Sequence, residues 1–157
     1  MADSVHYQCA TNVHTAIVAL ALPLPTSGNL PDAQKYLRKV LSDRLVTLPA
    51  VVVFLPPLGE QVLGGTNERD DWGYPVGVAI MAASNQDDGL DTDDEEYLRW
   101  RELIRKTFHQ KRGITTPAEV YKTVWEPAAV IDMGLWQQQN LWVQGGVVQC
   151  VTREART

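Results

Sequence analysis

The segment from Thr92 to Gly113 constrains the fold more than any other part of this 157-residue chain. It opens with the capping-box pattern Thr92-Asp93-Asp94-Glu95, and acids in the first turn suit the positive end of a helix dipole. Basic residues follow, and Glu95/Arg99 and Glu102/Lys106 have the favoured i,i+4 order for ion pairs. Large apolar residues at helical spacing mark the buried face: Tyr97, Trp100, Ile104 and Phe108. The segment therefore predicts a long amphipathic helix closed by Gly113.

The acidic start of this segment also invites a calcium interpretation, because residues 87–96 include seven acids in ten positions. If Gly89 filled the invariant glycine position of an EF-hand loop, Ser84 and Gln86 would occupy the first two ligand positions. Those positions need carboxylates or amides of short reach, so the match fails. We interpret the acids as a helix N-terminus and predict no metal site.

Two segments before this helix are typical of β-strands. Ala50–Leu55 is a β-branched run, which favours a well-buried strand. Tyr74–Met81 alternates bulky with small side chains, as a strand with two different faces does, and Pro75 is tolerated only at a strand beginning or an edge. Between them, Glu60–Leu63 predicts a short strand ended by glycines, and residues 66–73 predict a polar loop. This part of the chain reads as a β-meander.

Two helices are expected ahead of these strands. Thr11 or Asn12 can cap a short helix, whose inner positions would be Val13, Ile17 and Leu20 or Ala21. A proline-rich loop follows. A second helix should begin near Pro31-Asp32; its predicted inner stripe is Leu37, Val40, Leu41, Leu45 and Leu48, and its predicted outer residues are Lys35, Arg38, Lys39 and Asp43.

The last forty residues return to β-like sequence. Val120–Trp125 and Ala129–Met133 predict strands, and two more β-like runs flank Gly145-Gly146. These glycines make either a tight hairpin or a loop that enters one long final strand. The predicted fold class is therefore α+β: one domain over residues 1–157, with a mixed or mostly antiparallel sheet of about four to five strands packed against two or three helices.

Composition limits the partners and the compartment. The net charge of −5 disfavours wrapping of nucleic acid, because an acidic surface repels phosphate. Cys9 and Cys150 are too few for a disulfide scaffold and have no ligand spacing, so we expect buried thiols in a reducing compartment. The apolar run Ala16–Leu22 has no preceding Lys or Arg and is too short to span a bilayer, so we expect neither a signal peptide nor a membrane segment.

Signatures of catalysis are missing from the sequence. None of the patterns GxxxxGK[ST], GxGxxG, GxSxG or HExxH occurs. His6, His14 and His109 lie in unconnected contexts, and the neighbours of Cys150 indicate strand packing and supply no base. We therefore predict no catalytic residues, no cofactor and no metal. The alternative from another class is a small cytoplasmic enzyme or ligand-binding domain, whose site would be assembled from distant carboxylates.

Two charged segments are candidates for a protein contact. The first lies around Trp72, one of five tryptophans, a residue type that serves cores and interfaces. The second lies at the C-terminus. They can be a solvated loop and tail, or the rim and anchor of a subunit contact. On the second interpretation, the candidate interface residues are Arg69, Asp70, Asp71, Trp72, Arg153, Glu154 and Arg156.

The order of these elements resembles that of the tail-terminator and head–tail joining proteins of long-tailed bacteriophages, the minor-tail-protein-U-like group. The resemblance covers most of the chain from about Asp32. It rests on a helix ending near Arg44-Leu45 before Leu48–Val53, the polar segment Gly65–Asp71 entering Tyr74–Val78, the capped helix, Glu126-Pro127 with Val130–Asp132, and the ending Thr152–Arg156. The proline-rich segment Pro23–Pro31 departs from the family, in which the N-terminal helix is usually more continuous, so residues 1–31 form a variable N-terminal helix and loop.

The resemblance implies a structural virion protein without enzymatic activity or cofactor. Such proteins form a ring, usually of six copies, that caps the tail tube and joins it to the neck, while DNA passes through the lumen without being specifically bound. The acidic balance of the chain agrees with such a lumen. The implied location is the tail or neck of the virion, with the host cytoplasm before assembly. A head–tail adaptor on the portal side is the alternative within virion proteins.

Overall fold

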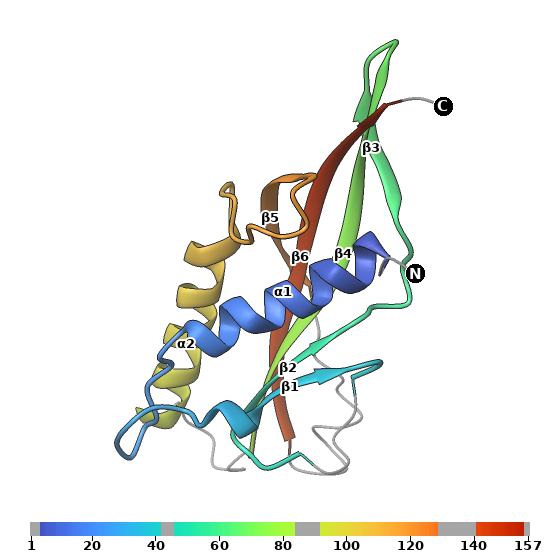
Figure 1. Ribbon diagram of the computed structural model, residues 1–157. Helices are drawn as coiled ribbons and strands as arrows, with labels where there is room; N and C mark the ends of the chain where they lie inside the picture. Colours follow the sequence, from blue (N-terminus) through green and yellow to red (C-terminus); the bar gives the residue numbers. More distant parts are fainter. Residues whose placement is uncertain (1–3, 42–45, 84–91, 129–140, 156–157) are drawn as a thin grey trace.

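A strongly twisted sheet organises the computed structural model, which describes residues 4–41, 46–83, 92–128 and 141–155 (Figure 1). Its strands are β1 (Lys35–Arg38), β2 (Ala50–Phe54), β3 (Gln61–Gly65), β4 (Arg69–Ala83), β5 (Val120–Ala128) and β6 (Leu141–Ala155). The strand order is β1-β2-β4-β6-β5, with β3 paired to β4 off this path. Among the described strands, β1 and β2 are the one parallel pair. The predicted α+β class is confirmed, although the sheet has six strands where about four to five were expected.

Two helices, α1 (Val5–Ala19) and α2 (Thr92–Phe108), supply the helical part of the main core. The buried cluster joins residues of both helices to one face of the sheet, including Val13 and Ile17 of α1 and Val51, Val53 and Val78 of the strands. From α2 it takes the four predicted residues Tyr97, Trp100, Ile104 and Phe108. The predicted ion pairs are also present, with Glu95 to Arg99 at 2.8 Å and Glu102 to Lys106 at 3.6 Å.

The opposite face of the sheet carries a second, smaller core. It consists of alternate strand residues, Val52, Phe54, Ala79, Met81, Leu141 and Val143. Gly77 belongs to this face because of close packing: a Cβ there would lie 2.5 Å from Cζ of Phe54. The predicted alternation of bulky and small residues in β4 thus has a physical role, since each face packs against a different layer.

The final strand settles the alternatives left open at Gly145-Gly146, because β6 runs through both glycines without a turn. Neither a hairpin nor a preceding loop occurs at these two positions. A Cβ on Gly145 would lie 2.1 Å from the carbonyl oxygen of Val78, and one on Gly146 would lie 2.4 Å from Cζ2 of Trp125. The glycines therefore allow close approach of β4 and β5, which composition alone does not distinguish from a turn.

Helix α1 begins earlier than predicted. Ser4 is the N-cap, and its hydroxyl accepts the Tyr7 N–H at 3.2 Å. Asn12, one of the expected caps, instead donates from its side chain to the Gln8 carbonyl within the helix. Polar residues inside a helix can thus imitate a cap in sequence.

The predicted second helix, expected from Pro31-Asp32 to about Leu48, is wrong for the described residues 31–41 and 46–48. After a short 3-10 turn at Asp32–Gln34, the chain forms β1, which pairs with β2 in the register Lys35↔Val51 to Arg38↔Phe54. Of the expected inner stripe, Leu37 is exposed, whereas Leu41 and Leu48 pack on the second core from outside any helix. Pairing with a fully buried strand overrides the helical periodicity. Leu45 lies outside the described residues.

Lys35, which was expected to face solvent, is 4% exposed. Its ammonium group donates to the carbonyls of Val18 and Leu20, both at 3.0 Å, and to the Asp32 carboxylate at 3.1 Å. It thus satisfies backbone acceptors at the C-terminal end of α1, where a positive charge is favourable.

Helix α2 ends at Phe108, and the residue with positive φ after it is Gln110, at 55°. Gly113 was expected to close the helix but does not. Its N–H donates to the buried Thr123 hydroxyl, and a Cβ there would lie 2.6 Å from Phe108. Gly113 is therefore a packing glycine between α2 and β5.

The polar loop predicted over residues 66–73 is mostly strand, since β4 starts at Arg69. β3 and β4 form a hairpin in the register Gln61↔Gly73 to Gly65↔Asp70, and Gly64-Gly65 lie within β3 instead of ending it. Pro75 sits in the middle of β4, where it faces Gln149 of β6 on one side. On its other side it lies between the part of β4 paired with β3 and the part paired with β2, so neither of those strands pairs with it. Its carbonyl accepts a hydrogen bond from His6 of α1, at 2.7 Å.

The strand predicted at Val120–Trp125 is confirmed within β5. The expected strand at Ala129–Met133, the calcium-like segment at 84–91 and the capping side chain of Thr92 lie outside the described residues.

Candidate subunit interface

The two charged segments predicted separately are neighbours in the sheet. Along the β4–β6 ladder, Asp70 faces Glu154, Asp71 faces Arg153 and Trp72 faces Thr152. The ladder continues to Arg69 opposite Ala155. Six of the seven candidate interface residues are thus brought together at one end of the molecule, and Arg156 lies outside the described residues.

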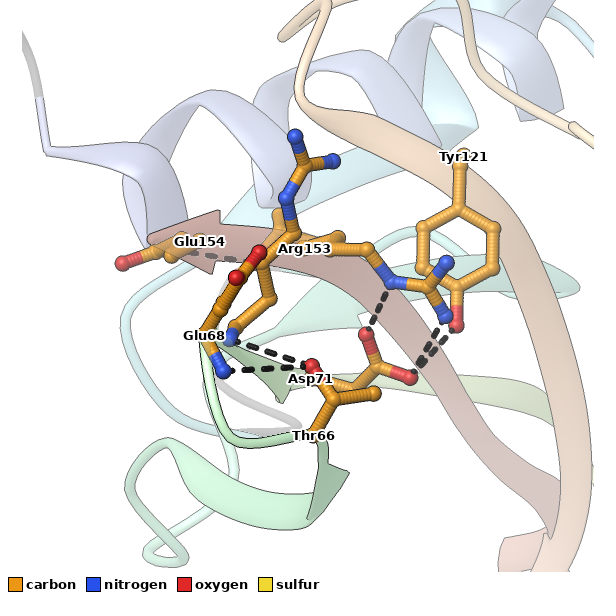
Figure 2. Close-up of polar contacts among 8 residues, drawn as sticks. Thr66, Glu68, Asp71, Tyr121, Arg153 and Glu154 are labelled. Carbon is orange, nitrogen blue, oxygen red and sulfur yellow. Dashed lines mark hydrogen bonds and ion pairs between the residues drawn. The ribbon is translucent and has the colours of Figure 1, made fainter. Parts of the chain in front are cut away.

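Asp71, Tyr121 and Arg153 form a cluster across three strands, here called the Asp71 cluster (Figure 2). The Arg153 guanidinium donates two hydrogen bonds to the Asp71 carboxylate, at 2.7 and 3.0 Å, and the Tyr121 hydroxyl donates to the same carboxylate at 3.1 Å. Arg153 also lies 5.0 Å from the centre of the Tyr121 ring. The hydrogen bond from Arg153 lowers the pKa of Asp71, and the carboxylate in turn raises the pKa of Arg153. The charges of Asp71 and Arg153 therefore stabilise each other, and the cluster joins β4, β6 and β5.

Glu154 is also engaged within the chain. Its carboxylate accepts hydrogen bonds from the Tyr74 hydroxyl at 2.9 Å and from the Thr152 hydroxyl at 3.1 Å. Burial and the Glu154 carboxylate together raise the pKa of Tyr74 to about 12. Asp71, Arg153 and Glu154 thus brace this end of the sheet, which differs from the free rim charges that the sequence suggested.

Arg69 and Trp72 are the two candidates best placed to meet a partner. Arg69 is exposed, and the Thr66 hydroxyl accepts its backbone N–H at 3.2 Å, which fixes the start of β4. No hydrogen bond or ion pair of its guanidinium to another described residue is present. Trp72 is half-buried, opposite Val62 of β3 on one side and Thr152 of β6 on the other. A cation and a half-covered indole on one strand suit a protein contact.

The feature that sequence reasoning missed is the hairpin arm, defined as residues 58–72 with β3 and the first part of β4. It projects away from the two helices in Figure 1, and all five residues of β3 are exposed. Its apolar residues Leu58, Val62 and Leu63 are 55%, 58% and 47% exposed. The sequence feature that could have indicated it is the apolar pair Val62-Leu63. This pair stands in a strand that is too short to build a hydrophobic core. Such a strand, unpaired on its outer edge within the described residues, calls for a covering partner.

His6, His14 and the two cysteines lie in structural settings. His6 bonds the Pro75 carbonyl, and His14 bonds the Lys35 carbonyl. Cys9 and Cys150 are free and buried, as predicted, and the contact with Cys9, together with burial, raises the pKa of Cys150. A raised pKa keeps the thiol protonated, which is unfavourable for a nucleophile. Within the part of the chain that the structure describes, no three His, Cys, Asp or Glu side chains gather as metal ligands would.

Comparison with protein-family models, with curated proteins and with solved structures found no match to this chain. Of the described helices, neither is long and apolar enough to cross a membrane.

Proposed function

We propose that this chain is a structural assembly protein of a phage-like particle, a tail terminator whose copies close into a ring. The observation that carries the proposal is the exposed hairpin arm beside the gathered interface candidates. Its apolar side chains remain about half exposed within the described chain, and the Asp71 cluster ties the turn end of the arm to β6 and β5. An exposed strand with apolar side chains that is held rigid suits a recurring protein contact better than it suits a solvated loop.

The proposed ring would cap the tail tube and offer its other surface to the neck. Its copies would associate through heterologous contacts, because only a head-to-tail arrangement generates closed rings of more than two equivalent subunits about one axis. DNA would pass through the lumen, and the net charge of −5 disfavours sticking to it. The rest of the resemblance supports the same assignment through the strand at Tyr74–Val78, helix α2 and the last strand, although β1 stands where the family-like helix before Leu48 was expected. The alternative within virion proteins is a head–tail adaptor on the portal side.

Solution mass and partner binding test this proposal together. We expect light scattering coupled to gel filtration to give a closed multiple of the 17.5 kDa chain, and electron microscopy to show rings. The protein should bind polymerised tail-tube protein at its end. Binding to the portal in place of the tube would favour the adaptor, whereas a strict monomer at every concentration that binds neither would overturn the proposal.

The contact residues can be tested apart from the fold. We expect Arg69→Ala combined with Trp72→Ala to abolish assembly while the circular dichroism spectrum is kept, because Arg69 lacks a described side-chain partner and Trp72 is only half-buried. The matched control is Arg105→Ala on the exposed side of α2, which should assemble normally. Unfolding of the double variant would show instead that these two residues support the sheet.

A further inference from the structure

We infer that the hairpin arm of one copy docks in a groove between α1 and β1 of the next copy. This inference rests on the proposed ring and names the two surfaces that would form it. The arm supplies the apolar side chains described above, and the groove is a separate surface on the body of the molecule. Two different patches on one chain are what a head-to-tail contact requires.

The groove has a volume of about 460 Å3 and a mostly apolar lining. Tyr7 and Ala10 of α1 form one wall, Leu37 of β1 forms the other, and Leu55 lies at the end of β2. Tyr7 is 52% exposed and Leu37 is 37% exposed, so the groove presents apolar surface to a binding partner. Its size and lining suit the branched aliphatic side chains of Val62 and Leu63.

Charge favours the same pairing. Arg38 and Lys39 line the groove, which makes its rim basic in an otherwise acidic protein. On the arm, Glu60 lies just before β3 and Glu68 lies in the turn between β3 and β4, and both are exposed. Arg69 is the one basic residue between positions 58 and 72. Opposite charges around an apolar centre set the orientation of a contact and exclude wrong registers.

The exposed apolar side chains of α2 do not offer the arm an equivalent site. Leu98 and Leu103 lie on α2, beside a second groove that is lined by Arg101, Arg105 and His109 together with Glu102. That groove lies beside β5, an edge strand of the described sheet, but its lining mixes basic residues with the acidic Glu102, and its apolar part is the largely buried Trp125 with Leu98 and Pro127. It serves here as the control surface.

A mixing experiment separates arm from groove. Val62→Asp disables the arm and leaves the groove intact, whereas Leu37→Asp disables the groove and leaves the arm intact. Each variant alone should have the mass of one chain in solution. An equimolar mixture should form a complex of two chains and nothing larger, because one intact arm meets one intact groove. Leu103→Asp on α2 is the control and should assemble as the unchanged protein does.

A charge exchange covers the case in which an apolar substitution disturbs folding. Arg38→Glu or Glu60→Arg alone should weaken assembly at least about fivefold, and the two together in one chain should restore most of it. Wild-type assembly that survives all these changes would overturn the arm–groove contact while leaving the proposed ring standing. A monomeric wild-type protein would remove the ring itself. Failure of the two disabled variants to form a complex, with both folded, would also overturn the contact.

Discussion

Lys35 shows how one residue can join three parts of this fold. It sits at the first position of β1, its ammonium group caps carbonyls at the end of α1, and its backbone carbonyl is bonded by His14. A buried ammonium group is tolerated because each of its donors has a partner. The helical pattern in the surrounding sequence predicted an exposed lysine. The neighbouring residues give no indication that the end of a helix distant in sequence lies against this position.

Replacing Lys35 by methionine therefore tests its role as a cap. We expect Lys35→Met to lower the free energy of unfolding by about 1–3 kcal/mol, because the Val18 and Leu20 carbonyls lose their donor in a largely buried site. Urea unfolding followed by tryptophan fluorescence measures this change. Lys106→Met, at an exposed ion pair, should cost less than about 0.5 kcal/mol. Equal losses in both variants would contradict the capping role.

Tyr74 makes the free energy of unfolding depend on pH in the alkaline range. Its pKa is about 12 in the folded protein, above the ordinary value of 10.0. Below pH 10 the phenol is protonated in both folded and unfolded chains, so it adds no pH dependence. Between pH 10 and 12 the unfolded chain releases this proton more readily, and stability falls as pH rises. We expect Tyr74→Phe to flatten the fall of stability in this window, as seen in unfolding midpoints at pH 9 to 11.5. An unchanged slope would assign it to other groups.

Two glycines in the strands differ in whether a side chain would fit at their position. Gly145 lies in β6 where a Cβ would meet the Val78 backbone, whereas nothing lies within 4 Å of a Cβ built on Gly64 in the arm. We expect Gly145→Ala to cost at least about 3 kcal/mol or to prevent folding, since backbone atoms of β4 would have to move. Gly64→Ala should change the melting temperature by only a few degrees. A tolerated Gly145→Ala would mean that the β4–β6 ladder gives way easily.

Elements whose signals are local could be predicted from the sequence, and those set by distant partners could not. The buried face and ion pairs of α2 and the buried run of β2 follow from periodicity and composition along a single segment. The expected helix at 31–48 fails because β1 depends on pairing with β2. The candidate interface residues lie at the start of β4 and the end of β6, and their role in a contact stays a prediction. Sequence alone does not show that Asp71 and Arg153 bind each other or that Tyr121 joins them.

The whole molecule combines a packed body with a projecting arm. Both helices lie against one face of the sheet, and the ladder of β4 and β6 carries that sheet outward to the arm. The Asp71 cluster lies within the arm near its turn, where Asp71 pairs with Gly64 of β3 and with Arg153 of β6, so its ion pair and ring contact limit bending of an otherwise exposed hairpin. A rigid arm binds at lower entropic cost than a flexible one. The residues of the Asp71 cluster, which stiffen the arm, therefore differ from the residues that make the contact. Both sets should strengthen assembly.

Because Arg153 lies outside the proposed contact surface, replacing it should affect assembly only through the order of the arm. Arg153→Ala removes the brace but leaves Val62, Leu63 and the groove unchanged. We expect weaker assembly by roughly twofold to fivefold, together with faster amide exchange across residues 61–72 and no change in exchange at α2. Arg99→Ala, which breaks an exposed ion pair on α2, is the control and should alter neither. Because the brace acts through arm order, faster exchange should be measurable even in the monomeric Val62→Asp background. Weaker assembly with unchanged exchange would place Arg153 in the contact itself.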